Sequence, residues 1–233
     1  MQKFKGITIS TSQYKDNDFI INILTQKGLI IPVTVRSGMK QESANKEFQY
    51  PFVIAEFETY SGGQKYEKLR CGNIEKMLIT SLSQNFKNLE IYGLLTEILK
   101  KFPPLEGEKN FYTLLDLTIN NLCEKDEKLK YTLLFLIVYI KLLGYNPMFN
   151  IEMPQFGSVY FNPDSTSFME DVDINDEKYF VLSAQEYTFL RNAFSKKYRE
   201  LEQIELEDNA RIYIKFLLKY LSAVSDTKII GFF

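Results

Sequence analysis

The fold of this chain depends on the stretch Tyr131-Thr-Leu-Leu-Phe-Leu-Ile-Val-Tyr-Ile-Lys-Leu-Leu143, whose apolar side chains point in nearly every direction around a helix. A helix of this kind is buried on all sides, so we expect it to form the centre of a helical core. Gly144 occupies the position of a left-handed helix end, and Pro147 prevents the helix from continuing. The apolar run is about half of the roughly 20 residues that a membrane span needs, so the sequence predicts no membrane crossing.

Helical patterns flank this run on both sides. Apolar residues step by three and four from 86 to 102, and again from 111 to 123. Ser183-Ala-Gln-Glu186 has the sequence of a capping box and opens a further helix. Residues 148–180 carry prolines, a glycine and short apolar pairs, which predict an irregular insert with one hairpin. A last helix is expected from about Asp208 to Ala223, with an apolar stripe of Ile212, Phe216, Leu217, Tyr220, Leu221 and Val224.

The first third of the chain has the two-residue period of β-strands instead. Pro32 cannot donate to a ladder, so the strand that contains it is expected to lie at an edge or to bulge there. Residues 37–50 are polar and too long for a tight turn, and we expect them to form a mobile loop. Alternation of apolar and polar residues predicts strands at 3–12, 19–25, 29–36, 52–60 and 66–71.

Five short strands within about seventy residues fit a small closed barrel of the OB type, a fold that binds oligonucleotides in many proteins. The predicted fold class is therefore α+β. We expect an N-terminal five-stranded OB-fold barrel at 1–80, followed by an all-α helical domain at 81–233 with an irregular insert at 148–181.

The composition, with 45% hydrophobic and 25% charged residues among 233, is that of an ordinary soluble globular protein. No histidine is present, which excludes Ser-His-Asp and Cys-His catalysis and removes the commonest metal ligand. The start, Met-Gln-Lys-Phe-Lys-Gly, lacks the apolar segment of a signal peptide, and the only cysteines are Cys71 and Cys123. These features indicate the reducing cytoplasm.

Basic residues are concentrated near the start of the chain. Residues 1–80 hold eleven Lys or Arg against eight Asp or Glu, whereas residues 81–233 hold seventeen against twenty-two. Single-stranded nucleic acid requires cations for its phosphates and flat aromatic rings for its unstacked bases. The alternative is that these side chains are solvated loop charges and half-buried tyrosines. The residues that could bind nucleic acid are Tyr14, Lys15, Arg36, Lys40, Lys46, Tyr50, Tyr66, Lys68 and Arg70.

Other candidate sites fail on their spacing. Residues 171–176 begin like a calcium loop, but Asp176 stands where the sharp turn needs glycine. Residues 61–65 are rich in glycine without the spacing of a P-loop. Cys71 and Cys123 lack companion ligands, so we expect both to be small buried residues and no zinc to be bound. A metal-dependent nuclease remains an open alternative, because thirty acidic residues offer many carboxylate pairs.

The order and spacing of several short motifs resemble those of the bacterial recombination mediator RecO, over nearly the whole chain. The motifs are Lys5-Gly6-Ile7-Thr8-Ile9, Tyr14-Lys15-Asp16-Asn17-Asp18 followed by Phe19 to Thr25, Gly28 to Gly38, Pro51-Phe52, Lys141-Leu142-Leu143-Gly144-Tyr145-Asn146-Pro147, Phe161-Asn162-Pro163, Leu182-Ser183 and the tail from Lys228 to Phe233.

This resemblance implies a non-enzymatic protein without a cofactor that binds single- and double-stranded DNA through its OB domain and anneals complementary strands. It implies RecR and the single-stranded-DNA-binding protein as partners, and help in loading RecA during RecF-type repair at the bacterial nucleoid. The DNA contacts that it carries over are Lys15 beside Tyr14, and Arg36, Lys40 and Lys46 in the loop after the third strand.

Two features depart from the family pattern. The four cysteines that many members place after the Leu-Gly-Tyr-x-Pro segment are absent from residues 148–181, so the resemblance implies a zinc-free insert. Glu42 and Glu47 also make the loop after the third strand less basic than usual. A protein-interaction scaffold whose barrel binds no nucleic acid is therefore kept as the alternative, and the acidic balance of residues 81–233 favours it slightly.

Overall fold

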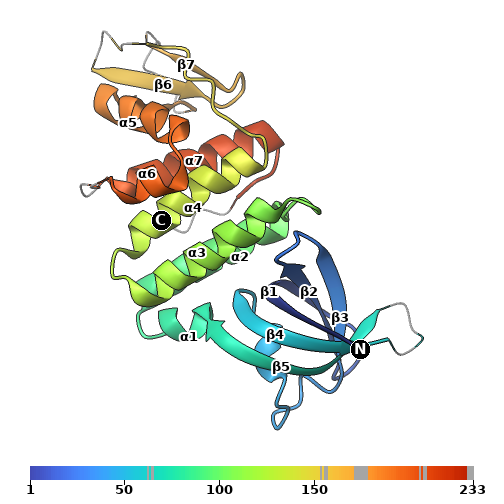
Figure 1. Cartoon of the computed structure of the whole chain (residues 1–233). Helices are drawn as coiled ribbons and strands as arrows, with labels where there is room; N and C mark the ends of the chain where they lie inside the picture. The colour runs from blue at the N-terminus through green and yellow to red at the C-terminus, as the bar shows by residue number, and fades with distance from the viewer. Residues whose placement is uncertain are drawn as a thin grey trace. The chain divides into compact units, whose positions relative to one another are not determined.

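Five strands close into a barrel at the start of the chain (Figure 1). Their order around the barrel is β1-β2-β3-β5-β4, and every pairing is antiparallel except the short parallel junction of β3 with β5. This arrangement confirms the predicted OB-type barrel and the α+β fold class. The strands are β1 (Gln2–Gln13), β2 (Phe19–Thr25), β3 (Ile30–Val35), β4 (Val53–Tyr60) and β5 (Glu67–Met77).

The computed structural model describes residues 1–61, 63, 66–152, 154, 157–170, 178–204, 206 and 209–229. The chain divides into two compact units, 1–128 and 129–233. The change from strand to helix falls at Met77 and Leu78, close to the expected end of the barrel, while the first unit continues to Lys128. A domain boundary at residue 80 therefore stays a prediction.

Two details of the strands depend on individual residues. Pro32 faces Asn22 of β2, and the ladder to β5 begins only at Val33, so the missing amide of Pro32 interrupts no pairing. Strand β5 extends six residues beyond the predicted end at Cys71, and a register shift opposite Glu58 and Thr59 turns the Cys71 side chain outward. The expectation that Cys71 is buried was therefore wrong: its residue is exposed.

The loop between β3 and β4 is anchored by an aromatic side chain. Its last part forms a 3-10 helix, η1 (Lys46–Gln49), and the Phe48 ring is 1% exposed in the barrel core. The Phe48 ring centroid lies 5.2 Å from that of Phe57, and Gly72 makes room for it, since a Cβ at Gly72 would lie 2.7 Å from Cε2 of Phe48. The polar composition of residues 37–50 hid this anchor from sequence analysis.

Three helices complete the first unit: α1 (Leu78–Leu82), α2 (Phe86–Lys101) and α3 (Lys109–Glu124). Helices α2 and α3 match the predicted ranges, whereas the short α1 was not predicted. The turn between α2 and α3 is fixed to the β2–β3 hairpin, because the Gly107 amide donates a 2.8 Å hydrogen bond to the Gly28 carbonyl. The ammonium group of Lys76 on β5 also bonds Asn120 and Glu124 of α3.

Helix α4 (Lys128–Leu142), which belongs to the second unit from its second residue onward, contains the apolar run, and every residue from 131 to 137 is buried. The helix ends in a Schellman motif: Gly144 has φ +85°, its amide bonds the Lys141 carbonyl, and the Tyr145 amide bonds the Ile140 carbonyl, both at 3.0 Å. This confirms the predicted buried helix and its end. No helix among the described residues combines the length and apolar character needed to cross a membrane.

The insert forms a three-stranded sheet in the order β7-β6-β8, where one hairpin was predicted. Its aromatic residues pack against α7, with Phe161 and Phe216 ring centroids 5.4 Å apart. The capping box of Ser183 and Glu186 is present as predicted. The remaining elements are β6 (Ser158–Asn162), β7 (Ser167–Met169), β8 (Phe180–Ser183), α5 (Ala184–Ser195), α6 (Tyr198–Glu202) and α7 (Ala210–Ser225).

One position of the predicted stripe on the last helix was wrong. Ile212 is 37% exposed, because the buried face of α7 follows Tyr213, Phe216, Leu217 and Tyr220, a spacing that leaves Ile212 at its margin.

Replacing Phe48 by Ala should lower the free energy of unfolding of the barrel by about 3–5 kcal/mol, because the ring leaves a cavity in the core. Native-state hydrogen exchange of the β1 to β5 amides measures this free energy. The matched control is Phe86→Ala, since Phe86 is 77% exposed and should give little change. Equal effects of the two substitutions would show that Phe48 is no anchor.

Candidate nucleic-acid interface

The turn between β1 and β2 presents Tyr14 and Lys15. The amides of Tyr14 and Lys15 donate to the Asp18 carbonyl at 3.0 and 3.3 Å, and the Asp18 amide donates back to the Lys15 carbonyl at 3.3 Å. These bonds close a compact turn on which Tyr14 is 44% exposed and Lys15 is exposed. The Lys15 ammonium lies 5.3 Å from the centroid of the Tyr14 ring, a cation–π contact that keeps charge and ring together.

The loop after β3 is bonded to this turn. The Ser37 amide donates a 2.8 Å hydrogen bond to a carboxylate oxygen of Asp18, and the Met39 amide donates at 3.1 Å to the Asn17 carbonyl. Arg36 and Lys40 stand on either side of these bonds and are exposed. The structure therefore brings Tyr14, Lys15, Arg36 and Lys40 together from two segments of the chain.

Gly38 lets this loop lie on the barrel core. A Cβ at position 38 would lie 2.8 Å from Cζ of Phe19 and 2.8 Å from Cγ1 of Val35, both of which are buried core side chains. Only a residue without a side chain permits so close an approach. Ser37 precedes it with φ +50°, so the backbone turns sharply at this point.

Lys46 belongs to the later part of the same loop. It is the first residue of η1 and is exposed, and its ammonium lies 3.4 Å from the Gln41 carbonyl. Its place is set by the Phe48 anchor two residues later, whereas Arg36 and Lys40 are placed by the bonds to the turn. Tyr50, also predicted from sequence, is 40% exposed immediately after this helix.

The four loop cations make no ion pair with any residue that the structure describes. The same segments also carry Asp16, Asp18, Glu42 and Glu47, so the surface is balanced in charge and is not strongly positive. The Asp18 carboxylate is occupied by the Ser37 amide. Among the described residues, this end of the barrel is distinguished by exposed cations without an ion pair beside an exposed tyrosine.

The two predicted cations on β5 have different surroundings. Arg70 is neutralised by Glu58, with 2.8 Å between guanidinium and carboxylate. Lys68 is only 6% exposed. Neither lies on the two bonded loops, and Tyr66, two residues before Lys68, is partly buried.

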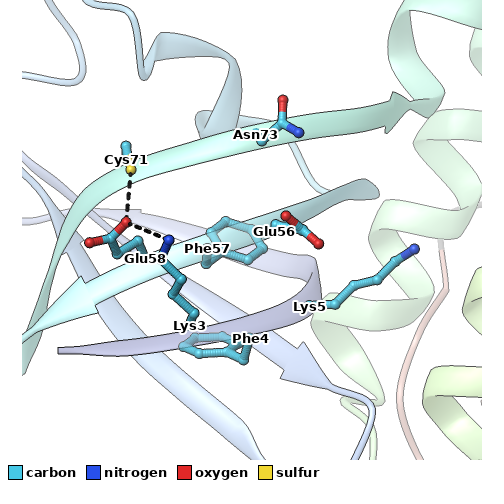
Figure 2. Close-up of a pocket in the computed structure, with 8 residues that line it drawn as sticks. All are labelled: Lys3, Phe4, Lys5, Glu56, Phe57, Glu58, Cys71 and Asn73. Carbon is cyan, nitrogen blue, oxygen red and sulfur yellow. Dashed lines mark hydrogen bonds and ion pairs between the residues drawn. The ribbon is translucent and has the colours of Figure 1, made fainter.

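A pocket of about 300 Å³ lies on the outer side of β1, β4 and β5 (Figure 2). Sequence analysis missed it, because the strand register that places its charges side by side cannot be read from alternation alone. Figure 2 shows Glu58 at its edge, bonded to Cys71 and Lys3 from the two neighbouring strands. The lining residues are Lys3, Phe4, Lys5, Glu56, Phe57, Glu58, Cys71 and Asn73.

The charges of this pocket are largely compensated. Lys3 lies 3.5 Å from Glu58, and Lys5 lies 2.6 Å from Glu75, a hydrogen bond that raises the pKa of Lys5. The Cys71 thiol donates to the Glu58 carboxylate at 3.6 Å. A negative neighbour of this kind disfavours the thiolate, which is the nucleophilic form of cysteine. The described residues that line this pocket therefore form a largely ion-paired sheet surface.

No cluster of three metal-ligating side chains occurs within the described ranges. Residues 171–177, which contain the sequence similar to a calcium loop, lie outside those ranges.

Part of the chain is similar to a known protein. Over 58 residues the chain is 38% identical to the DNA repair protein RecO of Leuconostoc citreum (strain KM20). The aligned stretch covers 25% of this chain and 22% of that protein, so the chain spans about a fifth of the length of the relative that it matches. A scan against protein-family models found no match.

Replacing Gly38 by Ala should destabilise the barrel by about 1–3 kcal/mol, because the added methyl group overlaps Phe19 and Val35. The control is Gly157→Ala, where a Cβ meets no atom within 4 Å. Unfolding in urea, followed by circular dichroism, measures both. A Gly38 variant as stable as the Gly157 variant would contradict the close packing of this loop.

Proposed function

We propose that this chain is a non-enzymatic, DNA-binding recombination mediator of the RecO type that acts in DNA repair. The partial similarity to a DNA repair protein supports the repair function, and the OB-type barrel supports nucleic acid as the ligand. Since one fold supports many functions, the DNA-binding function is argued from the residues of the candidate interface.

The observation that carries the proposal is the group of exposed, unpaired cations on the bonded loops. Lys15, Arg36 and Lys40 present positive charge beside the Tyr14 ring, and Lys46 continues it along the loop. Binding of such cations to phosphates releases counterions from the nucleic acid, which favours binding at low salt. An exposed aromatic ring can stack on a base of any type. The interleaved carboxylates of Glu42 and Glu47 would weaken the contact. We therefore expect moderate, sequence-tolerant and strongly salt-dependent binding.

From the resemblance to RecO we also propose more specific activities. The protein would bind single- and double-stranded DNA, anneal complementary strands and work with RecR to load RecA onto single strands covered by the single-stranded-DNA-binding protein. The place of action would be the bacterial cytoplasm, at the nucleoid. The rate of annealing of two complementary oligonucleotides, with and without that coat protein, tests this part separately from DNA binding.

A protein-interaction scaffold is the second candidate. The outer face of the three-stranded sheet places Tyr160 of β6 opposite Met169 of β7 and Val181 of β8, and Val181 is 51% exposed. Such an apolar row on an outer face is typical of a protein contact. A stable protein complex formed by a chain that fails to shift DNA would favour this function.

Changing Arg36, Lys40 and Lys46 together to Ala should weaken binding to a thymidine oligonucleotide about 10- to 100-fold at 50 mM salt. The slope of log affinity against log salt should fall by about 2, since each single-strand phosphate contact contributes roughly 0.7. Fluorescence anisotropy at 50 and 200 mM salt measures both quantities. Stability should change little, because exposed loop charges contribute little to it.

The matched control changes Lys27, Lys87 and Lys109 to Ala, three exposed lysines away from the bonded loops. It removes the same net charge and should weaken binding by less than about threefold. An equal loss of affinity in both triple variants would show that binding depends on net charge and not on the loop cations. If the wild-type chain binds no oligonucleotide, the proposed function is wrong.

A further inference from the structure

Lys68 is a nearly buried cation on the outer side of the barrel. In a strand, successive side chains point to opposite faces, and the neighbouring Leu69 lies in the barrel core, so Lys68 points outward. It is nevertheless only 6% exposed. The side chain is therefore held by packing, whereas the lysines of the loops are exposed.

Lys68 has no carboxylate partner among the residues that the structure describes. The nearby acids are engaged elsewhere: Glu67 accepts a hydrogen bond from the Thr59 hydroxyl, and Glu58 pairs with Arg70 and Lys3. The ammonium nitrogen is not one of the fully buried polar atoms that lack a partner, so the buried stem holds a charged tip that reaches solvent. An anionic group from outside the chain would supply the missing partner.

The neighbours of Lys68 fit a nucleotide. At the parallel β3–β5 junction Lys68 stands opposite Thr34, and Val33 of β3 lies in the core, so the Thr34 hydroxyl points outward as well. Thr34 is 5% exposed, and its hydroxyl bonds no residue within the described part of the chain. On the other side Lys68 stands opposite Tyr60 of β4, which is partly buried.

We propose that Lys68 and Thr34 form a phosphate subsite, in which the ammonium and the hydroxyl hold one phosphate group of a single-stranded nucleic acid while Tyr60 supports the adjoining base. The inference deepens the proposed function and rests on it. It assigns to the strands a contact by a packed side chain, whereas the cations of the loops are exposed. A positioned ammonium loses little conformational freedom on binding, so this contact should contribute more than an exposed lysine does.

The test uses Lys68→Met, which keeps the buried stem and removes the charge, with Lys68→Arg, Thr34→Val and the exposed control Lys27→Met. Binding of a thymidine oligonucleotide should weaken about tenfold in Lys68→Met, with a salt slope lower by about 0.7, and about threefold in Thr34→Val. Lys68→Arg should stay within about threefold of wild type, and Lys27→Met should be unchanged. If Lys68→Met binds as wild type does while the triple loop variant is weakened, the subsite is wrong and the loop interface stands.

A second measurement separates failure of the subsite from failure of the proposed function. Titration with inorganic pyrophosphate, followed by amide NMR, should shift Thr34 and Lys68 in the wild type and not in Lys68→Met. If pyrophosphate shifts these amides but the chain binds no oligonucleotide, Lys68 and Thr34 form an anion subsite whose ligand is not nucleic acid. That result would also overturn the proposed function. Absence of shifts at these two residues would overturn the subsite. The melting temperature of Lys68→Met should equal that of wild type, because the packed stem is retained and no ion pair is lost.

Discussion

Pairing of β1 with two strands at once is the constraint on which the barrel depends. Gly6 and Ile7 belong to both ladders, facing β2 on one side and β4 on the other. Between Thr8 and Ser10 the register shifts, and the strand bends at this bulge. The Thr8 hydroxyl donates to the Tyr50 carbonyl at 2.8 Å and accepts from the Val53 amide at 3.0 Å, so the bend is bonded directly to the start of β4. Bends of this kind are what allow a small sheet to close into a barrel.

Closure of the barrel also determines which loops meet. In the β2–β3 ladder Phe19 faces Val35, so the exit of β3 lies beside the turn that enters β2. The bonds from Ser37 to Asp18 and from Met39 to Asn17 then join the two loops. The cations of the candidate interface are therefore brought together by strand register, although 20 residues lie between Lys15 and Arg36 in the chain.

Sequence alone predicted the elements whose period is regular and could not predict features that depend on partners. Strand β2 and the helices α2, α3 and α4 were found because their apolar residues repeat without interruption. The side chain of Cys71 was wrongly predicted to be buried because one extra residue in β5 reverses the alternation of inward and outward side chains. The anchor at Phe48 was missed because a single buried ring in a polar loop has no periodic pattern. Lys15, Arg36, Lys40 and Lys46 were identified as candidates from residue type, but the pairing of Arg70 and the burial of Lys68 depend on register. The contribution of each of these residues to binding stays a prediction.

The loop between β3 and β4 is fixed at two points, by the hydrogen bonds at Ser37 and Met39 and by the ring of Phe48. Residues 41–45, which lie between them, make no contribution to the buried barrel core. Evolution can therefore lengthen, shorten or recharge this short segment without disturbing the scaffold. The length and charge of this loop are therefore free to diverge, while the barrel beneath it keeps its stability.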